Sequence, residues 1–310
     1  MHKMISFLIV FLLSSFHVDL MAQSDSTYME GCIKGYENSE LVIQEFYGNQ
    51  HSFVDTLYTD STGCFTFFPG AEKASGQLRL LLNKRQFLDF FYEKQSISFE
   101  ADFDHLLASM VIREDENNRL YYDYLNFRAS NEYKLNELRD MLAKSQEPGL
   151  SKDIVNEMNH LRNKETLYIR DFNHQNPKSL VTKVVMTDLI SAQLLDPDSS
   201  GYSNYLVKHF LDELDFNDTI LLRTNTLSVK LISYLSLAIK NTDNYDSTVA
   251  RLSQSADQLL NRSMVNEVMF NFIKDYLING FSTLGYKDLA IKVRAVTFRH
   301  ARSGEENGTE

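Results

Sequence analysis

Five polar side chains in one short stretch have the types and spacing best suited to chemistry: His209, Asp212, Asp215, Asp218 and Arg223. A histidine titrates near neutral pH, carboxylates accept protons and attract cations, and an arginine holds anions. These residues separate two apolar series of helical spacing, so we expect one helix to run to about Leu214 and a second to follow an acidic break. Two interpretations stay open: a polar cluster that binds a partner, or helix caps and an ion pair that hold the break together.

The sequence contains two cysteines, Cys32 and Cys64, on two predicted strands. They lie 64 − 32 = 32 positions apart, with no C-x-x-C pair and no His/Cys cluster of zinc spacing, so redox catalysis and structural zinc are poorly supported. Strand alternation places both thiols in the outward phase, where they are neighbours if these strands pair. A disulfide is one hypothesis, favoured by an oxidising compartment. Two unpaired thiols are the other, because cross-strand Cβ atoms usually lie somewhat too far apart for an ideal bridge.

Other groups of polar and aromatic residues have simpler explanations. His160 and Glu165 lie on one predicted helix, but their spacing is not H-E-x-x-H, so we expect His160 on a solvated face. The acidic run at 114–116 suits the first turn of a helix, and the aromatic residues at 121–127 suit packing between helices and sheet. There is no G-x-S-x-G, phosphate-binding glycine loop or dinucleotide fingerprint. The sequence therefore predicts no catalytic residue, no cofactor and no metal site, and favours a protein that is not an enzyme.

The first residues of the chain have the pattern of an export signal. Lys3 precedes an apolar run at 5–13, far shorter than the roughly 20 apolar residues of a spanning helix, and Ala22 suits cleavage before Gln23. We therefore expect a periplasmic or secreted protein with no membrane span after signal removal, rather than an amphipathic first helix of the fold. The net charge of −11 is unchanged by that removal, because one charge of each sign is lost. An acidic chain does not favour nucleic acid, so the expected partner is a periplasmic protein or peptide.

The apolar pattern changes once along the chain, from a period of two at 28–112 to a period of 3.6 after Arg113. Short alternating segments between turn residues predict an antiparallel β-sandwich. The helical part begins with a long hairpin, broken around Pro148, whose second helix Ser151 would cap. The fold class is thus α+β, an N-terminal antiparallel β-sandwich followed by an all-α helical-hairpin region. The expected parts are a signal peptide at 1–22, the sandwich at 23–113, a helical hairpin region at 114–197, a C-terminal helical domain at 198–302 and a disordered tail at 303–310.

The ends of later helices are predicted from the same signals. Proline disfavours helix in the residue before it, so the hairpin is expected to end at Asn176 and a third helix near Pro197. Asp246 is the candidate cap of another helix, and the next one is expected to run up to Gly280.

Short motifs follow one another in an order that resembles a known family. They are T-D-S-T-G-C-F-T-F at 59–67, N-P-K-S at 176–179, H-F-x-D-x-x-D-F at 209–216 and L-L-R-T at 221–224. Over roughly residues 28–300 the chain resembles the non-catalytic N-terminal part of exported thioredoxin-like proteins of Gram-negative bacteria. That part consists of a β-sandwich domain and a helical domain, both of unknown function, and a thioredoxin fold with a C-x-x-C pair follows it. Neither cysteine here forms such a pair, so the redox residues of that family match nothing in this sequence.

Two classes of function follow from these observations. The first is an exported, non-enzymatic binding or interaction module of unknown ligand. The second, implied by the resemblance, is the substrate-positioning portion of a periplasmic thiol-disulfide oxidoreductase whose catalytic domain is missing or on another chain. In either case we expect that this chain does not itself reduce disulfides, because thiol exchange needs an attacking thiolate and normally a resolving thiol close to it.

Overall fold

The computed structural model describes three ranges of the chain, 27–189, 200–239 and 244–298. Three predicted features lie outside them, namely the export signal at 1–22 with cleavage before Gln23, the tail at 303–310 and the helix end near Pro197.

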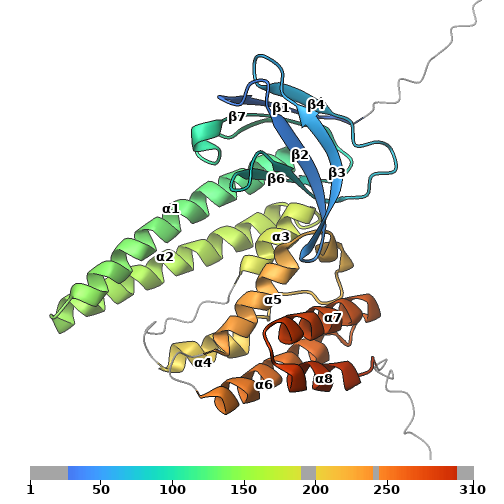
Figure 1. The fold of residues 1–310 in the computed structure, drawn as a ribbon. Coiled ribbons are helices and arrows are strands. Elements are labelled where there is room, and N and C mark those ends of the chain that lie inside the picture. The colour runs from blue at the N-terminus through green and yellow to red at the C-terminus, as the bar shows by residue number, and fades with distance from the viewer. Residues whose placement is uncertain (1–26, 190–199, 240–243, 299–310) are drawn as a thin grey trace, which may run out of the picture.

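The first part of the chain folds into two four-stranded sheets, seen in blue and teal at the top of Figure 1. One sheet contains, in order, β4 (Cys64–Phe67), β1 (Met29–Lys34), β7 (Ile97–Asp102) and β8 (Val111–Glu114). The other contains, in order, β3 (Gln50–Tyr58), β2 (Glu40–Tyr47), β5 (Gly76–Leu81) and β6 (Phe87–Tyr92). The predicted α+β class is confirmed, with one difference in detail: β1 pairs parallel with β7. The long excursion of the chain through the second sheet makes this possible, because parallel neighbours need a long connection.

The structure joins Cys32 and Cys64 in a disulfide between β1 and β4. The two residues lie directly opposite each other in the antiparallel register. The backbone N–H of Ile33 donates to the carbonyl of Gly63 next to them, so the cysteines occupy a non-hydrogen-bonded pair. Side chains approach more closely in such pairs, which explains how a cross-strand bridge fits here.

The rest of the chain is helical. Its elements are α1 (Glu116–Lys144), α2 (Pro148–Gln175), α3 (Leu180–Asp188), α4 (Ser200–His209), the short 3-10 helix η2 (Thr219–Arg223), α5 (Thr226–Leu237), α6 (Tyr245–Ser263), α7 (Glu267–Thr283) and α8 (Lys287–Ala295). Figure 1 shows α1 and α2 as a long antiparallel hairpin that projects away from the other helices. A single 3-10 turn, η1 (Phe103–His105), connects β7 to the segment before β8.

Two helix ends near the predicted breaks differ from expectation. The second hairpin helix begins at Pro148 rather than after Ser151, because proline is favoured in the first turn, where its missing N–H costs nothing. The helix before the acidic break ends at His209 rather than Leu214. The apolar residues that suggested further helix, at Phe210, Leu211 and Leu214, belong to irregular turns, but their side chains are nonetheless buried in the helical core.

Two further ends are also corrected. Asn244, not Asp246, caps α6, because its side-chain oxygen accepts from the N–H of Ser247. The next helix starts after Asn266, which accepts two backbone N–H groups, and runs past Gly280 to Thr283.

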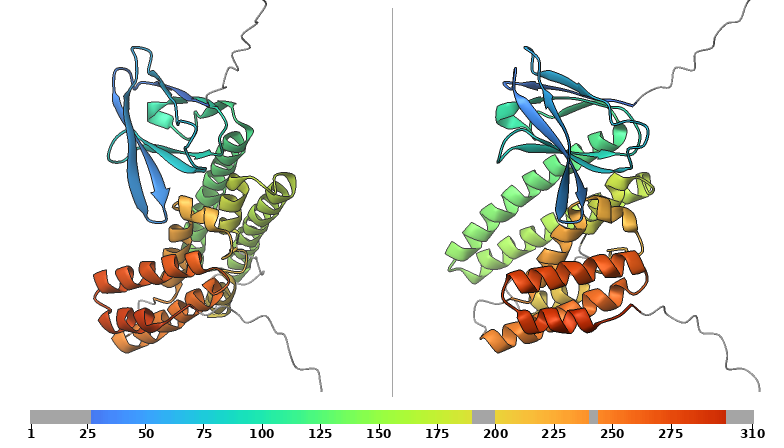
Figure 2. Two further views of the ribbon diagram at one scale, coloured as in Figure 1. Left: turned by 90° about the vertical axis from the view of Figure 1, so that its right-hand side faces the viewer. Right: turned by 45° about the vertical axis from the view of Figure 1, so that its right-hand side comes forward.

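The sandwich and the helices meet at η2, the segment that follows the predicted acidic break. The tip of the β2–β3 hairpin contacts it through the N–H of Gly48, which donates to the carbonyl of Leu222 at 2.7 Å. Beside it, the N–H of Asn225 donates to the Gln77 side chain of β5 at 2.9 Å. The views in Figure 2 show the hairpin reaching down to the helices at this point. This contact places the hairpin tip next to α7, where a groove forms.

Buried side chains form separate clusters in the sandwich and in the α5–α8 region. Within the three described ranges, no helix has both the length and the apolar composition required to cross a membrane.

Candidate functional site

The structure places His209 and Asp212 in contact, with Nδ1 and Oδ2 2.7 Å apart. Arg262 of α6 pairs with the same carboxylate at 2.8 Å and also donates to the carbonyl of Leu211 at 2.9 Å. Partial burial raises the pKa of Asp212, but the hydrogen bonds from Arg262 and His209 outweigh it, so the pKa lies below its ordinary value. This group ties the turn after α4 to α6.

The other predicted site residues serve different neighbours. Asp215 accepts from the N–H of Asn217 in a local turn. Asp218 caps η2 and forms an ion pair with Lys183 of α3 at 2.7 Å. Arg223 is exposed at the end of η2. The five predicted residues therefore share no common partner. The contacts of His209, Asp212, Asp215 and Asp218 are caps, local turns and ion pairs, as the structural interpretation of the break expects.

The N-P-K-S motif lies beside a polar cleft of about 520 Å³ between the sandwich and the start of α3. The Glu93 carboxylate, in the turn after β6, accepts from the N–H of Leu180 at 3.0 Å and from the Asn117 side chain at 3.1 Å. The Ser179 hydroxyl lies 3.4 Å from it and also caps α3. Asp115 caps α1 and accepts from a glutamine side chain. The acidic residues of this cleft are thus occupied in joining elements. Of the run at 114–116, which was predicted to form the first turn of a helix, Glu116 lies in the first turn of α1 and Asp115 is its N-cap.

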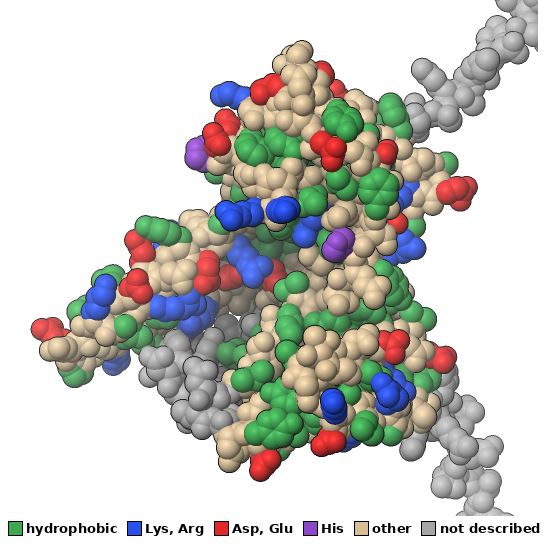
Figure 3. Space-filling model, viewed as in Figure 1, with side chains coloured by type: hydrophobic (Ala, Val, Ile, Leu, Met, Phe, Trp, Pro, Cys, Tyr) green, Lys and Arg blue, Asp and Glu red, His purple; other side chains and the backbone are tan. Residues whose placement is uncertain are grey.

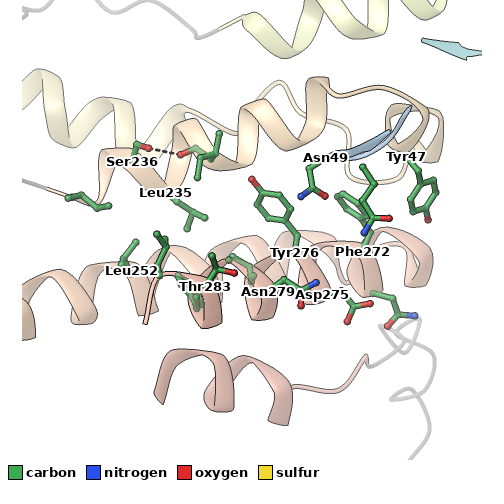
Figure 4. A pocket seen from close by; sticks show the side chains of 18 of the residues that line it. Tyr47, Asn49, Leu235, Ser236, Leu252, Phe272, Asp275, Tyr276, Asn279 and Thr283 are labelled. Atoms are coloured by element: carbon green, nitrogen blue, oxygen red, sulfur yellow. Dashed lines mark hydrogen bonds between the residues drawn. The ribbon is translucent and has the colours of Figure 1, made fainter. Parts of the chain in front are cut away.

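A second hollow, the α5–α7 groove, has a different character. Its volume is about 860 Å³, and it lies between α5 and α7, with the β2–β3 hairpin tip at one end and part of α6 at the other. Figure 4 shows Leu235 pointing from α5 into the space that Phe272 and Tyr276 enter from α7, while the Ser236 hydroxyl donates back to the carbonyl of Ile232. Around the junction of the hairpin and α7, Figure 3 shows hydrophobic side chains gathered at the surface.

The groove exists because α7 has two apolar faces. One face is fully buried in the helical core, through Met269, Ile273 and Leu277 among others. The adjacent face carries Phe272 and Tyr276, which are only half-buried and line the groove. Side chains four residues apart share a helix face, so Phe272 and Tyr276 lie on one face, which continues to Gly280. The face with Phe272 and Tyr276 therefore adds apolar surface that is not fully buried in the helical core.

The hairpin tip is fixed against this face by glycine. Gly48 has a φ of +58°, and a Cβ at this position would lie 2.1 Å from the Phe272 ring. Only glycine adopts this conformation freely and allows such a close approach. Tyr47 packs edge-on against Phe272, with ring centroids 5.8 Å apart. The Tyr276 hydroxyl donates to the carbonyl of Ser228 on α5 at 3.3 Å, and burial raises the pKa of this phenol.

Polar side chains line the groove without partners. Asn271, Asp275 and Asn279 follow one another at four-residue intervals on α7, and Asn49 faces them from the hairpin tip. In the part of the chain that the structure describes, none of these four side chains hydrogen-bonds or ion-pairs with another residue. Asp275 is the single charged residue among the described residues that line the groove. These groups are available to a ligand.

One buried cation lies outside the groove. Lys230 of α5 is 6% exposed, and its Nζ lies 4.1 Å from the centroid of the Phe210 ring. Burial lowers its pKa to about 8. Nearby, Asp188 accepts from the Tyr124 hydroxyl at 2.9 Å and pairs with Arg128 at 2.6 Å, so that carboxylate is already engaged.

Two minor sequence candidates also have structural surroundings. Glu165 lies 3.3 Å from the side-chain amide of Asn131 between α1 and α2, and burial raises its pKa. His160 is exposed on α2. Among the described residues there is no group of three or more His, Cys, Asp or Glu side chains that could hold a metal ion.

Comparison with known proteins gives a single family match. Residues 171–301 match the family model described as Domain of unknown function (DUF5106). No curated protein and no solved structure matches the chain. The match covers the helices of the groove but not the β2–β3 hairpin that closes one end of it. It agrees with a helical domain of unknown function in the second half of the chain.

Sequence analysis did not predict the groove. Phe272 and Tyr276 lie in the helix that was expected to run up to Gly280, and no further role was predicted for them. The available signal was the polar series Asn271, Asp275 and Asn279 interleaved with aromatic residues, which gives α7 a mixed face next to its core face. The contribution of the hairpin tip depends on tertiary contacts and has no local signal.

Proposed function

We propose that the chain is a binding module that holds a segment of another polypeptide in the α5–α7 groove. The observation that carries this proposal is the combination of an apolar hollow with carboxamide and carboxylate groups that have no protein partner. These polar side chains are exposed, so they are free to hydrogen-bond a ligand that covers the apolar surface beside them.

The size and exposure of the groove support this function. Its volume of about 860 Å³ falls within the range of about 300–1,000 Å³ that is typical of ligand sites. Three of its apolar side chains are largely exposed to solvent: Ile232 at 48%, Val268 at 53% and Leu284 at 64%. Apolar patches rimmed by polar residues commonly mark interaction sites. Covering these side chains would contribute the main favourable free energy of binding.

The proposal extends to the compartment and to an association. Export to the periplasm is supported by the pattern of residues 1–22, and the order of motifs supports a role beside a thioredoxin-like protein. Cys32 and Cys64 are the two cysteines of the sequence, and both are in the disulfide. While that bond is intact, these 310 residues have no thiolate to attack a disulfide, so any exchange reaction on a bound segment needs a thiolate from outside them.

The test is to fill the groove at Gly280. This residue lies on the groove face of α7, and a Cβ there would have nothing within 4 Å, so a large side chain can enter the open space without a clash in the core. Peptides are first selected from a phage-displayed random library on the purified chain. Their dissociation constants are then measured by fluorescence anisotropy for the parent, Gly280→Trp and Gly149→Trp. Gly149 is a matched control, since it also lies in a helix with open space around its Cβ, at the distant end of the α1–α2 hairpin.

We expect Gly280→Trp to weaken binding of the selected peptides at least tenfold and Gly149→Trp to leave it unchanged. Circular dichroism and thermal unfolding verify that both variants are folded. Equal affinity of the parent and folded Gly280→Trp for every selected peptide would exclude the groove as the binding site. For the proposed association, insulin reduction with dithiothreitol provides a second check: turnover above background that disappears in Cys32→Ser would show that the chain itself is an oxidoreductase.

A further inference from the structure

The charge of the groove restricts what it can bind. Asp275 is exposed near the middle of α7, and its neighbours at four-residue spacing, Asn271 and Asn279, are neutral. Lys274, the nearest cation along the helix, is engaged elsewhere, since its Nζ donates to the carbonyl of Val296 at 2.6 Å. The whole chain carries a net charge of −11. Local and overall charge therefore both favour a cationic group next to Asp275 and disfavour an anionic ligand.

The uncharged polar groups favour a peptide backbone. Asn49 and Gln50 at the hairpin tip and Asn271 and Asn279 on α7 are all carboxamides, each with a donor and an acceptor. A peptide backbone offers the complementary acceptor and donor at every residue. A hydrocarbon chain would leave these groups unpaired when it covered them, which costs free energy. The lining thus selects against a lipid tail and in favour of a polypeptide.

The spacing sets the length of the recognised segment. With a rise of about 1.5 Å per residue, Asn271 and Asn279 are separated by about 12 Å along the helix axis. An extended chain covers about 12 Å in three to four residues. A residue in the middle of such a segment lies near Asp275, while its neighbours lie over Phe272 and Tyr276 or face the apolar side chains of α5.

We infer that the groove, if it is the binding site proposed above, recognises an extended, apolar polypeptide segment with one lysine or arginine that pairs with Asp275. The two flanking asparagines of α7 and the hairpin-tip amides hydrogen-bond the backbone of that segment. The apolar residues on either side of the cation cover Phe272, Tyr276 and the exposed side chains of α5.

The test uses two labelled peptides that differ at one position. Both are selected as tight groove binders whose affinity Gly280→Trp reduces, and one carries a central lysine where the other carries glutamine. Dissociation constants are measured at low and at high salt for the parent, Asp275→Asn and Asp275→Lys. Asp288→Asn is the control, because Asp288 is exposed in the first turn of α8 and does not line the groove.

We expect the parent and Asp288→Asn to prefer the lysine peptide roughly fivefold at low salt, as for a partly exposed ion pair, with the preference shrinking at high salt. In Asp275→Asn the preference disappears while the glutamine peptide binds as before. In Asp275→Lys the preference reverses and the glutamine peptide binds more tightly, because the lysine peptide then meets a like charge. Equal binding of both peptides by the parent, or an equal preference in Asp275→Asn, would overturn this inference and leave the groove as a site. Failure of Gly280→Trp to weaken either peptide would instead refute the proposed function.

Discussion

The cleft at Asn176–Ser179 and the α5–α7 groove are both surface hollows with polar linings, yet their side chains behave in opposite ways. In the cleft, Glu93 accepts from a backbone N–H and a side-chain amide and Ser179 caps a helix, so these groups hold the sandwich to α3. In the groove, Asn271 and Asp275 face solvent beside half-buried aromatic rings. Polar composition alone therefore does not mark a site. The distinction is whether the protein already uses the hydrogen-bonding capacity of its polar groups.

The largest expected effect on the free energy of unfolding follows from removing the disulfide of the sandwich. Replacing both cysteines (Cys32→Ser with Cys64→Ser) removes a bridge between residues 32 positions apart. In the chain-entropy model a loop of this length contributes about 3–4 kcal/mol to the free energy of unfolding. Urea unfolding should show this loss, while peptide affinity for the groove stays within about twofold, since the disulfide joins β1 and β4, which belong to the sheet that does not contain the β2–β3 hairpin. Unchanged stability would mean that the bond does not form in the isolated protein.

A matched pair of substitutions tests the difference between the paired polar groups of the cleft and the unpaired polar groups of the groove. Glu93→Ala leaves the N–H of Leu180 and the Asn117 amide without their acceptor, so we expect a loss of about 1–3 kcal/mol in the free energy of unfolding. Asn279→Ala removes an exposed side chain without protein partners, and we expect a change within about 0.5 kcal/mol. Both values come from the same urea titration. Similar losses in the two variants would show that the groove asparagine has a structural role that the described contacts do not reveal.

Lys230 is a buried cation, and its effect on the pH dependence of stability can be measured. Burial lowers its pKa to about 8, whereas an unfolded lysine titrates near 10.4. Between about pH 8 and 9.5 the unfolded state therefore binds more protons, so stability should rise with pH by up to about 1.4 kcal/mol per pH unit. Lys230→Met should be more stable than the parent at pH 7 and lack this rise. Parallel pH profiles for the two proteins would contradict the lowered pKa.

A small stabilising effect is expected at Gly280. A glycine inside a helix is less favourable than alanine by about 0.5–1 kcal/mol, and a methyl group here meets nothing. Gly280→Ala should therefore raise the free energy of unfolding by about this amount without closing the groove. Thermal unfolding measures the gain in stability, and fluorescence anisotropy with a selected peptide verifies that the groove still binds. A loss of stability would show that α7 needs glycine at this position for a reason other than space.

Much of the fold could be predicted from the sequence because it depends on local periodicity. The alternation in the sandwich and the helical spacing after Arg113 predict the α+β class. The end of α4 was misplaced because Phe210 and Leu214 are buried from irregular turns, which mimic a helical pattern. The predicted polar cluster did not become a common site, since Asp212 and Asp218 pair with Arg262 and Lys183, which are remote in sequence.

The groove itself could not be predicted by such reasoning. It requires Gly48 of the hairpin to meet Phe272 of α7, and residues so far apart in the chain carry no local sign of their contact. Likewise, whether an asparagine is paired or free is decided by its tertiary neighbours. Sequence patterns identify which faces are apolar, but the assembled structure decides which of those faces are left uncovered.

We propose that the α5–α7 groove binds another polypeptide, and that the cleft at 176–179, whose polar groups already have protein partners, does not. Hydrogen–deuterium exchange with and without a selected peptide tests it most directly. The account predicts slower exchange in the α7 peptides spanning 268–284 and in the hairpin tip at 47–50, with no change at 176–180. Protection confined to 176–180, or to the α1–α2 hairpin, would contradict it.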